Sequence, residues 1–250
     1  MAIHLPLSAE AQKEAQELMT AQHNLLKPAD GSPVLAIYQD VVLGSYYLTY
    51  DKPGTESDKP LAFSSVYEAE MAYDRGDIAL QTPIRVFTKK EIRDTTLGRV
   101  IFNEILPVDY PYDNGVQTSK HLKKVMANIF NDYGSKVTVE VADKLKDLAF
   151  EYETIASIST CKDDYPTYPE IADFIAKGDA KTALIQDQYD QGLLTDTERY
   201  NLTVANWREI DGEISSFLKQ KLATMDTDIA VMTNSGARGY VSGIKLASAA

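Results

Sequence analysis

The spacing of hydrophobic and polar residues predicts short elements in the first half of this chain and longer helices in the second. Ser8 is a suitable N-cap for a helix over 9–22, because its hydroxyl can accept a hydrogen bond from the first turn. The apolar residues of this segment recur at helical spacing and form one stripe: Ala11, Ala15, Leu18 and Met19. A second short amphipathic helix is predicted over 65–76, with Gly76 as the residue that ends it.

The segments that follow indicate turns and at least one strand. The composition of 27–33 predicts a tight turn, and that of 51–60 predicts a surface loop. Alternation of apolar and polar residues over 84–88 predicts a strand. Helix and strand both fit the segment 96–106, whose large apolar residues are Leu97, Val100, Ile101, Phe102 and Ile105.

Helical spacing becomes more regular after this point. One helix is predicted over 120–133 and is closed by Gly134. A second is predicted over 137–149, with an inward face of Val141, Leu145 and Leu148. Two prolines and several polar residues then break the periodicity over 163–169, which predicts a boundary between two parts of the chain.

Beyond that boundary the pattern predicts an antiparallel helical hairpin. A helix over 171–189 ends at Gly192, and Thr195 and Glu198 form a capping box that starts the next helix. The second helix carries a heptad-like apolar seam: Tyr200, Trp207 and Ile214, with Ile210 and Phe217 three positions after two of them. Each arm of about 20 residues would reach roughly 30 Å. Such a hairpin either projects as a handle for other proteins or packs against its own domain, and the pattern leaves both open.

The composition is that of an ordinary globular protein, with 44% hydrophobic and 25% charged residues. No run of 18 apolar residues and no signal-like N-terminus is present, so neither a membrane span nor secretion is expected. The single cysteine, Cys161, excludes an internal disulfide and fits a reducing cytoplasm. We interpret it as a small residue near a packed edge rather than a nucleophile.

The net charge of −12 argues against broad contact with a phosphate backbone. Eight basic and five acidic residues lie between 84 and 124, whereas 19 acidic and nine basic residues lie between 139 and 228. The acidic half fits a solvated surface, a surface for a basic protein partner, or an entrance that repels nucleic acid.

Motifs for phosphate loops, dinucleotide binding, zinc proteases and hydrolases are all missing from the sequence. The adjacent carboxylates Asp163 and Asp164 could bind a cation, but neighbours in an extended segment point to opposite sides, so a loop or capping role is favoured. Two glycines flank Arg238 in the run 234–239, a pattern that fits either an ordinary turn or a backbone that presents a guanidinium to phosphate.

Five stretches, taken together and in order, resemble the β′ subunit family of bacterial-type RNA polymerases. They are Met1-Ala2-Ile3-His4-Leu5-Pro6-Leu7-Ser8, Gln39-Asp40-Val41-Val42-Leu43-Gly44, Thr95-Thr96-Leu97-Gly98-Arg99, Gly192-Leu193-Leu194-Thr195 and Ser235-Gly236-Ala237-Arg238-Gly239. Their order and their spread over nearly the whole chain make the set far more specific than any single motif.

The resemblance implies an α+β fold, in which a mixed pore-region domain is followed by a long antiparallel helical hairpin. The mixed domain over 1–165 would line the active centre and the secondary channel, and 166–228 would hold the hairpin of rim helices. The segment 229–250 would lead toward the bridge helix. The chain is thus expected to take part in DNA-directed nucleotidyl transfer only within the assembled enzyme, and to be inactive alone.

The resemblance also implies roles for single residues. Asn24 and Gln39 match positions near the nucleotide and the RNA end, and Arg238 matches a contact to the triphosphate of the incoming nucleotide. Glu198 and Asn201 would lie near the tip of the hairpin, where factors dock. No catalytic residue and no metal ligand is expected, because the loop that holds Mg²⁺ in the complete enzyme would precede the first residue.

The chain departs from the family after Gly239, where Gly243-Ile244-Lys245-Leu246-Ala247 replaces a Gln-Ile-Arg-Gln-Leu run.

The partners that the resemblance implies are the β, α, ω and sigma subunits, the DNA template and RNA, nucleoside triphosphates, and Gre-type and DksA-type factors of the secondary channel. No membrane partner is expected. The alternative is a free-standing, non-enzymatic protein that binds transcription factors through its hairpin.

Overall fold

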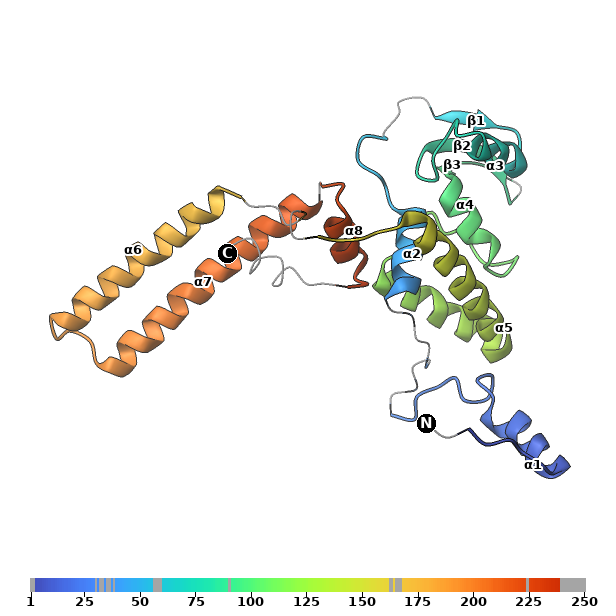
Figure 1. Cartoon of the computed structure of the whole chain (residues 1–250), viewed down its shortest axis with the longest axis horizontal. Coiled ribbons are helices and arrows are strands. Elements are labelled where there is room, and N and C mark those ends of the chain that lie inside the picture. The colour runs from blue at the N-terminus through green and yellow to red at the C-terminus, as the bar shows by residue number, and fades with distance from the viewer. Residues whose placement is uncertain are drawn as a thin grey trace. The chain divides into compact units, whose positions relative to one another are not determined.

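The structure is a computed structural model (Figure 1), and it describes residues 3–29, 31, 34, 37, 39–55, 60–89, 91–161, 164, 168–223 and 225–238. Two compact units make up these residues. The first runs to Ile158 and takes in Ser235–Ala237, and the second begins at Ser159. The predicted boundary over 163–169 and the departure after Gly239 fall largely outside the described residues.

The first unit opens with α1 (Ala9–Glu14), which continues as the π-helix η1 (Ala15–Met19). The Ser8 hydroxyl accepts a hydrogen bond from the Ala11 N–H at 3.1 Å, which confirms the predicted N-cap. The helical segment ends at Met19, three residues earlier than predicted. Its apolar stripe is not part of the core, because no residue of α1 or η1 is buried.

A three-stranded sheet follows, with strand order β1-β2-β3. It consists of β1 (Leu61–Phe63), β2 (Pro83–Thr88) and β3 (Glu91–Thr96), with β1 parallel and β3 antiparallel to β2. The predicted strand over 84–88 is confirmed as part of β2. Ile84 and Val86 are buried and join the core, as the period of two in a half-buried strand requires.

Four helices build the core together with this sheet (Figure 1). They are α2 (Asp40–Thr49), α3 (Val66–Asp74), α4 (Leu97–Glu104) and α5 (Ser119–Ala156). The helices that lie directly against the sheet are α3 and α4, whereas α2 packs against α4 and α5. The segment 96–106, which fitted both helix and strand, is thus helical. Ser65, Thr96 and Thr118 each cap the following helix through a side-chain oxygen.

The predicted break at Gly134 is confirmed inside α5. Its φ of 77° and ψ of 178° are non-helical, so α5 is two helical stretches joined by a kink. The predicted inward face of the second stretch is also correct for Val141 and Leu145, which are buried, whereas Leu148 is only half-buried.

The closest packing in the first unit brings α2 against both α4 and α5. A Cβ atom placed on Gly44 would lie 1.9 Å from the Ala149 carbonyl oxygen, and one placed on Gly98 would lie 1.8 Å from the Leu48 carbonyl oxygen. Only hydrogen atoms fit at these two contacts. The backbone of α2 therefore touches its neighbours directly, without intervening side chains.

Polar side chains tie the same helices together at their ends. Arg99 of α4 is buried, and it donates to the Thr49 carbonyl at 3.1 Å and to the Asp51 carboxylate at 2.6 Å. The Gln117 N–H donates to the Thr49 hydroxyl at 2.9 Å. The end of α2 is thereby joined to α4 and to the loop that leads into α5.

The Asp113 carboxylate organises that loop. It accepts hydrogen bonds from the Gly115 N–H at 2.9 Å and the Gln117 side chain at 3.0 Å, and it lies 2.6 Å from the His121 ring. Burial would raise the pKa of the Asp113 carboxyl, but these hydrogen bonds outweigh it and hold the pKa below its usual value. The backbone of Asp113 is anchored separately by the Asn103 side chain.

The second unit contains the predicted antiparallel hairpin, formed by α6 (Glu170–Asp190) and α7 (Asp196–Ala223) (Figure 1). Its core is built from Ile171, Ile210, Ile214 and Leu218, with Trp207 and Phe217 packed against it. Tyr200, which we placed in the seam, is 64% exposed, so that assignment was wrong. A short helix, α8 (Asp228–Ser235), packs Ile229 and Ala230 on Leu222.

We expect Gly98→Ala to destabilise the chain, because the added methyl group would overlap the Leu48 carbonyl oxygen. Overpacking of this kind costs about 1–3 kcal/mol or more. The control is Gly212→Ala in α7, where nothing lies within 4 Å of the added atom. That change should stabilise by about 0.5–1 kcal/mol, because glycine is unfavourable inside a helix. Urea unfolding followed by circular dichroism measures both, and equal effects would contradict the close contact.

The hydrogen bonds to Asp113 predict an acid-sensitive contribution to stability. Since the pKa of its carboxyl is lowered in the folded state, the contribution is present above the unfolded pKa and is lost as the pH falls through the folded pKa. Asp113→Asn should therefore lower the free energy of unfolding at neutral pH, and its difference from the wild type should shrink toward pH 3 or so. Asp143→Asn, at an exposed position of α5, is the control. A difference independent of pH would contradict the prediction.

Candidate functional site

The hairpin of α6 and α7 is a candidate surface for binding another molecule. Gly192 adopts a φ of 75° in its turn, and the N–H groups of Gly192 and Leu193 satisfy the carbonyls of Tyr189 and Gln188 at the end of α6. Thr195 and Glu198 then start α7. The backbone hydrogen bonds at both helix ends are thus satisfied within the turn, which gives the tip a defined conformation.

The two tip residues that we expected to dock factors have different surroundings. The Glu198 carboxylate accepts hydrogen bonds from the Thr195 N–H at 2.9 Å and from its hydroxyl at 2.7 Å, which confirms the capping box. These hydrogen bonds hold the pKa of the Glu198 carboxyl below its usual value, and the one from the Thr195 N–H has the larger effect. Asn201 is exposed and lies one turn further along the same face. Glu198 therefore has a structural role whether or not it also meets a partner.

Exposed apolar side chains accompany these residues. Leu193 in the turn is 69% exposed, and Tyr200 and Leu202 on α7 are also exposed. Because Leu202 lies four residues after Glu198, the two share one side of α7. The tip thus combines a carboxylate, a carboxamide and apolar surface.

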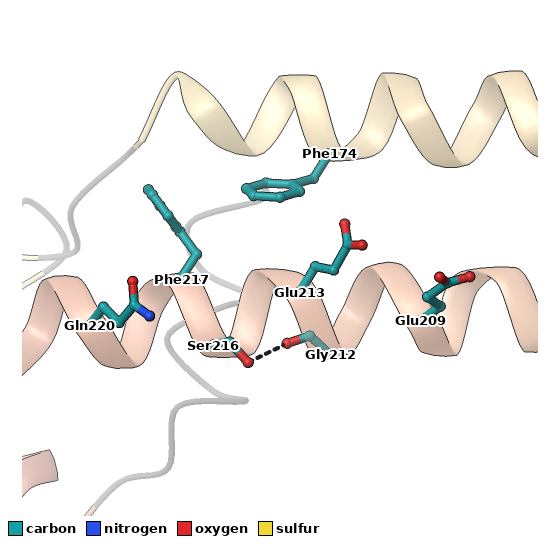
Figure 2. Close-up of a pocket in the computed structure, with 7 residues that line it drawn as sticks. All are labelled: Phe174, Glu209, Gly212, Glu213, Ser216, Phe217 and Gln220. Carbon is teal, nitrogen blue, oxygen red and sulfur yellow. Dashed lines mark hydrogen bonds between the residues drawn. The ribbon is translucent and has the colours of Figure 1, made fainter.

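A groove of about 640 Å³ runs along the hairpin nearer its open end (Figure 2). Its lining residues are Phe174 of α6 and, on α7, Glu209, Gly212, Glu213, Ser216, Phe217 and Gln220. The rings of Phe174 and Phe217 lie between the two helices, with centroids 5.8 Å apart. The lining of the groove thus combines two aromatic rings with polar side chains of α7.

Ion pairs across the hairpin join the two helices beside this groove. Lys177 donates to both carboxylate oxygens of Glu213, at 2.7 and 2.9 Å, and Lys181 donates to Glu209 at 2.7 Å. The hydrogen bond from Lys181 holds the pKa of Glu209 below its usual value. Sequence reasoning missed this ladder. Its signal was present, since each helix repeats one charge at a spacing of four residues.

The hairpin also buries a polar contact that the sequence did not indicate. The Asn206 side chain is buried, and it donates to the Gly178 carbonyl at 2.9 Å and to the Thr182 hydroxyl at 3.1 Å. Trp207 packs over Gly178, where an added Cβ would lie 2.9 Å from its ring. These contacts fix the register of α6 against α7.

The residues expected to lie near a nucleotide come from three separate elements. The Asn24 carboxamide donates to the carbonyls of Leu18 and Thr20 after η1. Gln39 is exposed and precedes α2, with φ 50° and ψ −121°. Arg238 is exposed and follows α8, two residues after Gly236, whose φ of 73° is usual for a glycine that ends a helix and leaves both interpretations of this run open. Gly239, the second flanking glycine, lies outside the described residues.

The remaining candidates from the sequence are Cys161 and the carboxylate pair Asp163 and Asp164. The Asp164 carboxylate accepts a hydrogen bond from the Cys161 N–H at 2.6 Å, which is a loop role, and Asp163 lies outside the described residues. Cys161 is exposed, so our placement of it at a packed edge was wrong. Among the described residues, no three His, Cys, Asp or Glu side chains gather as a metal site needs.

Within the described ranges, no helix combines the length and the apolar composition that a membrane span requires.

The chain is similar to known proteins along almost its whole length. Residues 24–165 match the family described as RNA polymerase Rpb1, domain 3.

The β′ subunit of DNA-directed RNA polymerase from Desulforamulus reducens is 40% identical over 249 residues, which cover 98% of this chain and 21% of the relative. The β′ subunit from Acetivibrio thermocellus is 39% identical, covering 98% of this chain and 23% of the relative. The β′ subunit from Nocardioides sp. is 38% identical, and the alignment covers 100% of this chain and 20% of the relative. The chain thus spans about a fifth of the length of these curated relatives.

These matches confirm the resemblance to β′ subunits that the sequence motifs indicated. Because the matched domain covers more than half of the chain, the chain belongs to the RNA polymerase Rpb1 domain 3 family.

Proposed function

We propose that the chain is part of the β′ subunit of a DNA-directed RNA polymerase and acts in DNA-templated transcription within the assembled enzyme. The observation that carries this proposal is the alignment of 98% of the chain with β′ subunits at 40% identity. A free-standing interaction protein, the alternative, is not favoured by such a match. The purified chain should be inactive, because phosphoryl transfer depends on metal ions that stabilise the developing charge. Unaided extension of an RNA primer by the chain would contradict the proposal.

In this proposal the parts of the chain have different tasks. Residues 1–165 line the active centre and the secondary channel, the hairpin within 166–228 docks cleavage and regulatory factors, and 229–250 leads toward the bridge helix. The other polymerase subunits, DNA, RNA and nucleoside triphosphates are the partners, and the cytoplasm is the compartment. Mg²⁺ would supply charge stabilisation in the complete enzyme from ligands outside this chain.

The geometry of the hairpin supports docking at its tip. The tip has satisfied helix ends, an ion-paired stem and exposed apolar side chains at Leu193 and Tyr200. A rigid scaffold that presents exposed apolar and polar groups together is typical of a protein-binding surface. Such a surface suits the binding of a Gre-type or DksA-type factor.

We expect Asn201→Ala and Glu198→Gln in the complete enzyme to weaken the binding of a Gre-type cleavage factor by about two- to tenfold, as for the loss of one hydrogen bond. Basal elongation should persist. Glutamine keeps the capping box, so Glu198→Gln removes the charge without removing the cap. Fluorescence anisotropy with a labelled factor measures the affinity, and Lys219→Ala, at an exposed site on α7, is the control.

Two outcomes would contradict a docking role. Equal losses of elongation and of factor binding would indicate general damage to the enzyme. Normal binding with Glu198→Gln but weak binding with Glu198→Ala would show that Glu198 acts through the helix cap alone.

For Arg238→Ala in the complete enzyme we expect a higher apparent KM for nucleoside triphosphates. A hydrogen bond to a charged group contributes about 1.5–3 kcal/mol, so the KM should rise by roughly tenfold to a hundredfold. Arg238→Lys keeps the charge but loses the bidentate geometry, and it should give a smaller rise. Steady-state nucleotide addition measures both. An unchanged KM and rate would remove Arg238 from the nucleotide site.

A further inference from the structure

The described residues at the tip of the hairpin form no apolar core. The buried residues that cluster between α6 and α7 are Ile171, Ile210, Ile214 and Leu218, and all of them lie nearer the open end. The range 186–205, which the structure describes in full, takes in the last turn of α6, the connecting turn and the first turns of α7, and none of its residues is buried. Apolar packing therefore does not determine how the two helices meet at the tip.

One side chain joins the two helices where this packing stops. Arg199 of α7 donates to the Gln186 side-chain oxygen at 3.4 Å and to the Asp196 carboxylate at 2.7 Å. Its guanidinium also lies over the Tyr189 ring, 5.0 Å from the centroid, which is within the range of a cation–π contact. Because Gln186 and Tyr189 belong to α6 and Asp196 belongs to α7, these three contacts of Arg199 connect the helices across the turn.

These contacts add little to the stability of the hairpin. The Asp196 side chain is 74% exposed, and ion pairs at the surface stabilise a fold only weakly. The Nε atom of Arg199 is buried without a hydrogen-bond partner among the described residues, which is unfavourable. The contacts of Arg199 therefore determine the geometry of the tip more than the free energy of unfolding.

The same contacts enclose the turn of the hairpin. Tyr189 lies in the last turn of α6 and Asp196 is the first residue of α7, so a side chain that holds both of them fixes the path of the chain between them. Leu193 lies within that turn and is 69% exposed. Asn201 is exposed and follows Arg199 by two residues on α7. The position of exposed groups in the turn relative to those on α7 thus depends on Arg199.

We propose that Arg199 is a positioning residue for factor docking, which holds Leu193 of the turn and Asn201 of α7 in one arrangement that a partner recognises. The tip presents apolar side chains beside the Glu198 carboxylate, so it fits a partner surface that combines apolar side chains with hydrogen-bond donors. Groups that are already ordered lower the entropic cost of binding. The inference rests on the proposed docking role of the hairpin.

The binding arm of the test uses the complete enzyme and a fluorescently labelled Gre-type cleavage factor, with the affinity measured by anisotropy. Arg199→Ala should weaken binding by about two- to tenfold, the cost of ordering a side chain at an interface. Tyr189→Phe keeps the ring beneath the guanidinium and should bind like the wild type, whereas Tyr189→Leu should weaken binding. Because both residues act through one contact, the double variant Arg199→Ala/Tyr189→Leu should lose less than the product of the two single losses.

The matched control is Lys221→Ala at the opposite end of the hairpin. Lys221 makes the same kinds of contact, since it lies 5.3 Å from the Phe217 ring centroid and 3.7 Å from the Glu170 carboxylate. Its removal should leave the affinity for the factor unchanged. Equal losses for Lys221→Ala and Arg199→Ala would overturn the proposal, because any contact between the helices would then have the same effect.

Hydrogen exchange of the 250-residue chain separates positioning from general stability. Arg199→Ala should speed the exchange of the Gly192 and Leu193 amides, which are hydrogen-bonded to carbonyls at the end of α6, by about two- to tenfold. The exchange of the Ile210 amide in the stem and the midpoint of urea unfolding should remain close to those of the wild type. A lower midpoint together with faster exchange along both helices would show that Arg199 is a structural residue, and would overturn the proposal.

The outcomes also separate this inference from the proposed function. Binding of the factor with equal affinity by the wild-type enzyme and the Arg199→Ala enzyme would overturn the role of Arg199 alone. Failure of the wild-type complete enzyme to bind the factor would overturn the proposed docking role, and this inference with it.

Discussion

The direct backbone contact of α2 with α4 and α5 is the constraint on which the first unit depends. It requires glycine at positions 44 and 98, because any side chain there would overlap a carbonyl oxygen of the neighbouring helix. Leu48 and Phe102 are almost fully buried in the same core, which also takes in Ile84 and Val86 of the sheet. The tight packing of protein interiors leaves little room to absorb a change at such a contact.

Polar contacts hold the ends of the same helices where apolar packing stops. Arg99 is the one charged side chain among the described residues that is buried, and its carboxylate partner Asp51 lies near the surface. A buried charge is tolerated only when it is paired and hydrogen-bonded. The Asp113 cluster has a comparable task at the entry to α5, since it joins that loop to α4 through Asn103. Both clusters position backbone segments.

The two units are stabilised in different ways. The second unit relies on an antiparallel helix pair that is joined by ion pairs. The first unit has a dense core around α2, and the exposed Gln39 at the start of that helix has a positive φ.

The sequence by itself determined the features that depend on neighbouring residues. Capping by Ser8, the capping box of Thr195 and Glu198, the break at Gly134 and the turn at Gly192 follow from local backbone chemistry, and all are found in the structure. The family was also within reach, because its motifs are local and ordered.

Only the tertiary structure decided how distant segments meet. It made 97–104 a helix, exposed Tyr200, set Gly44 against Ala149, and paired Lys177 with Glu213. Residues three or four positions apart constrain each other through the helix they share, so their spacing can be read directly. Residues tens of positions apart meet only when the whole chain packs, and no local spacing records which partner they will find.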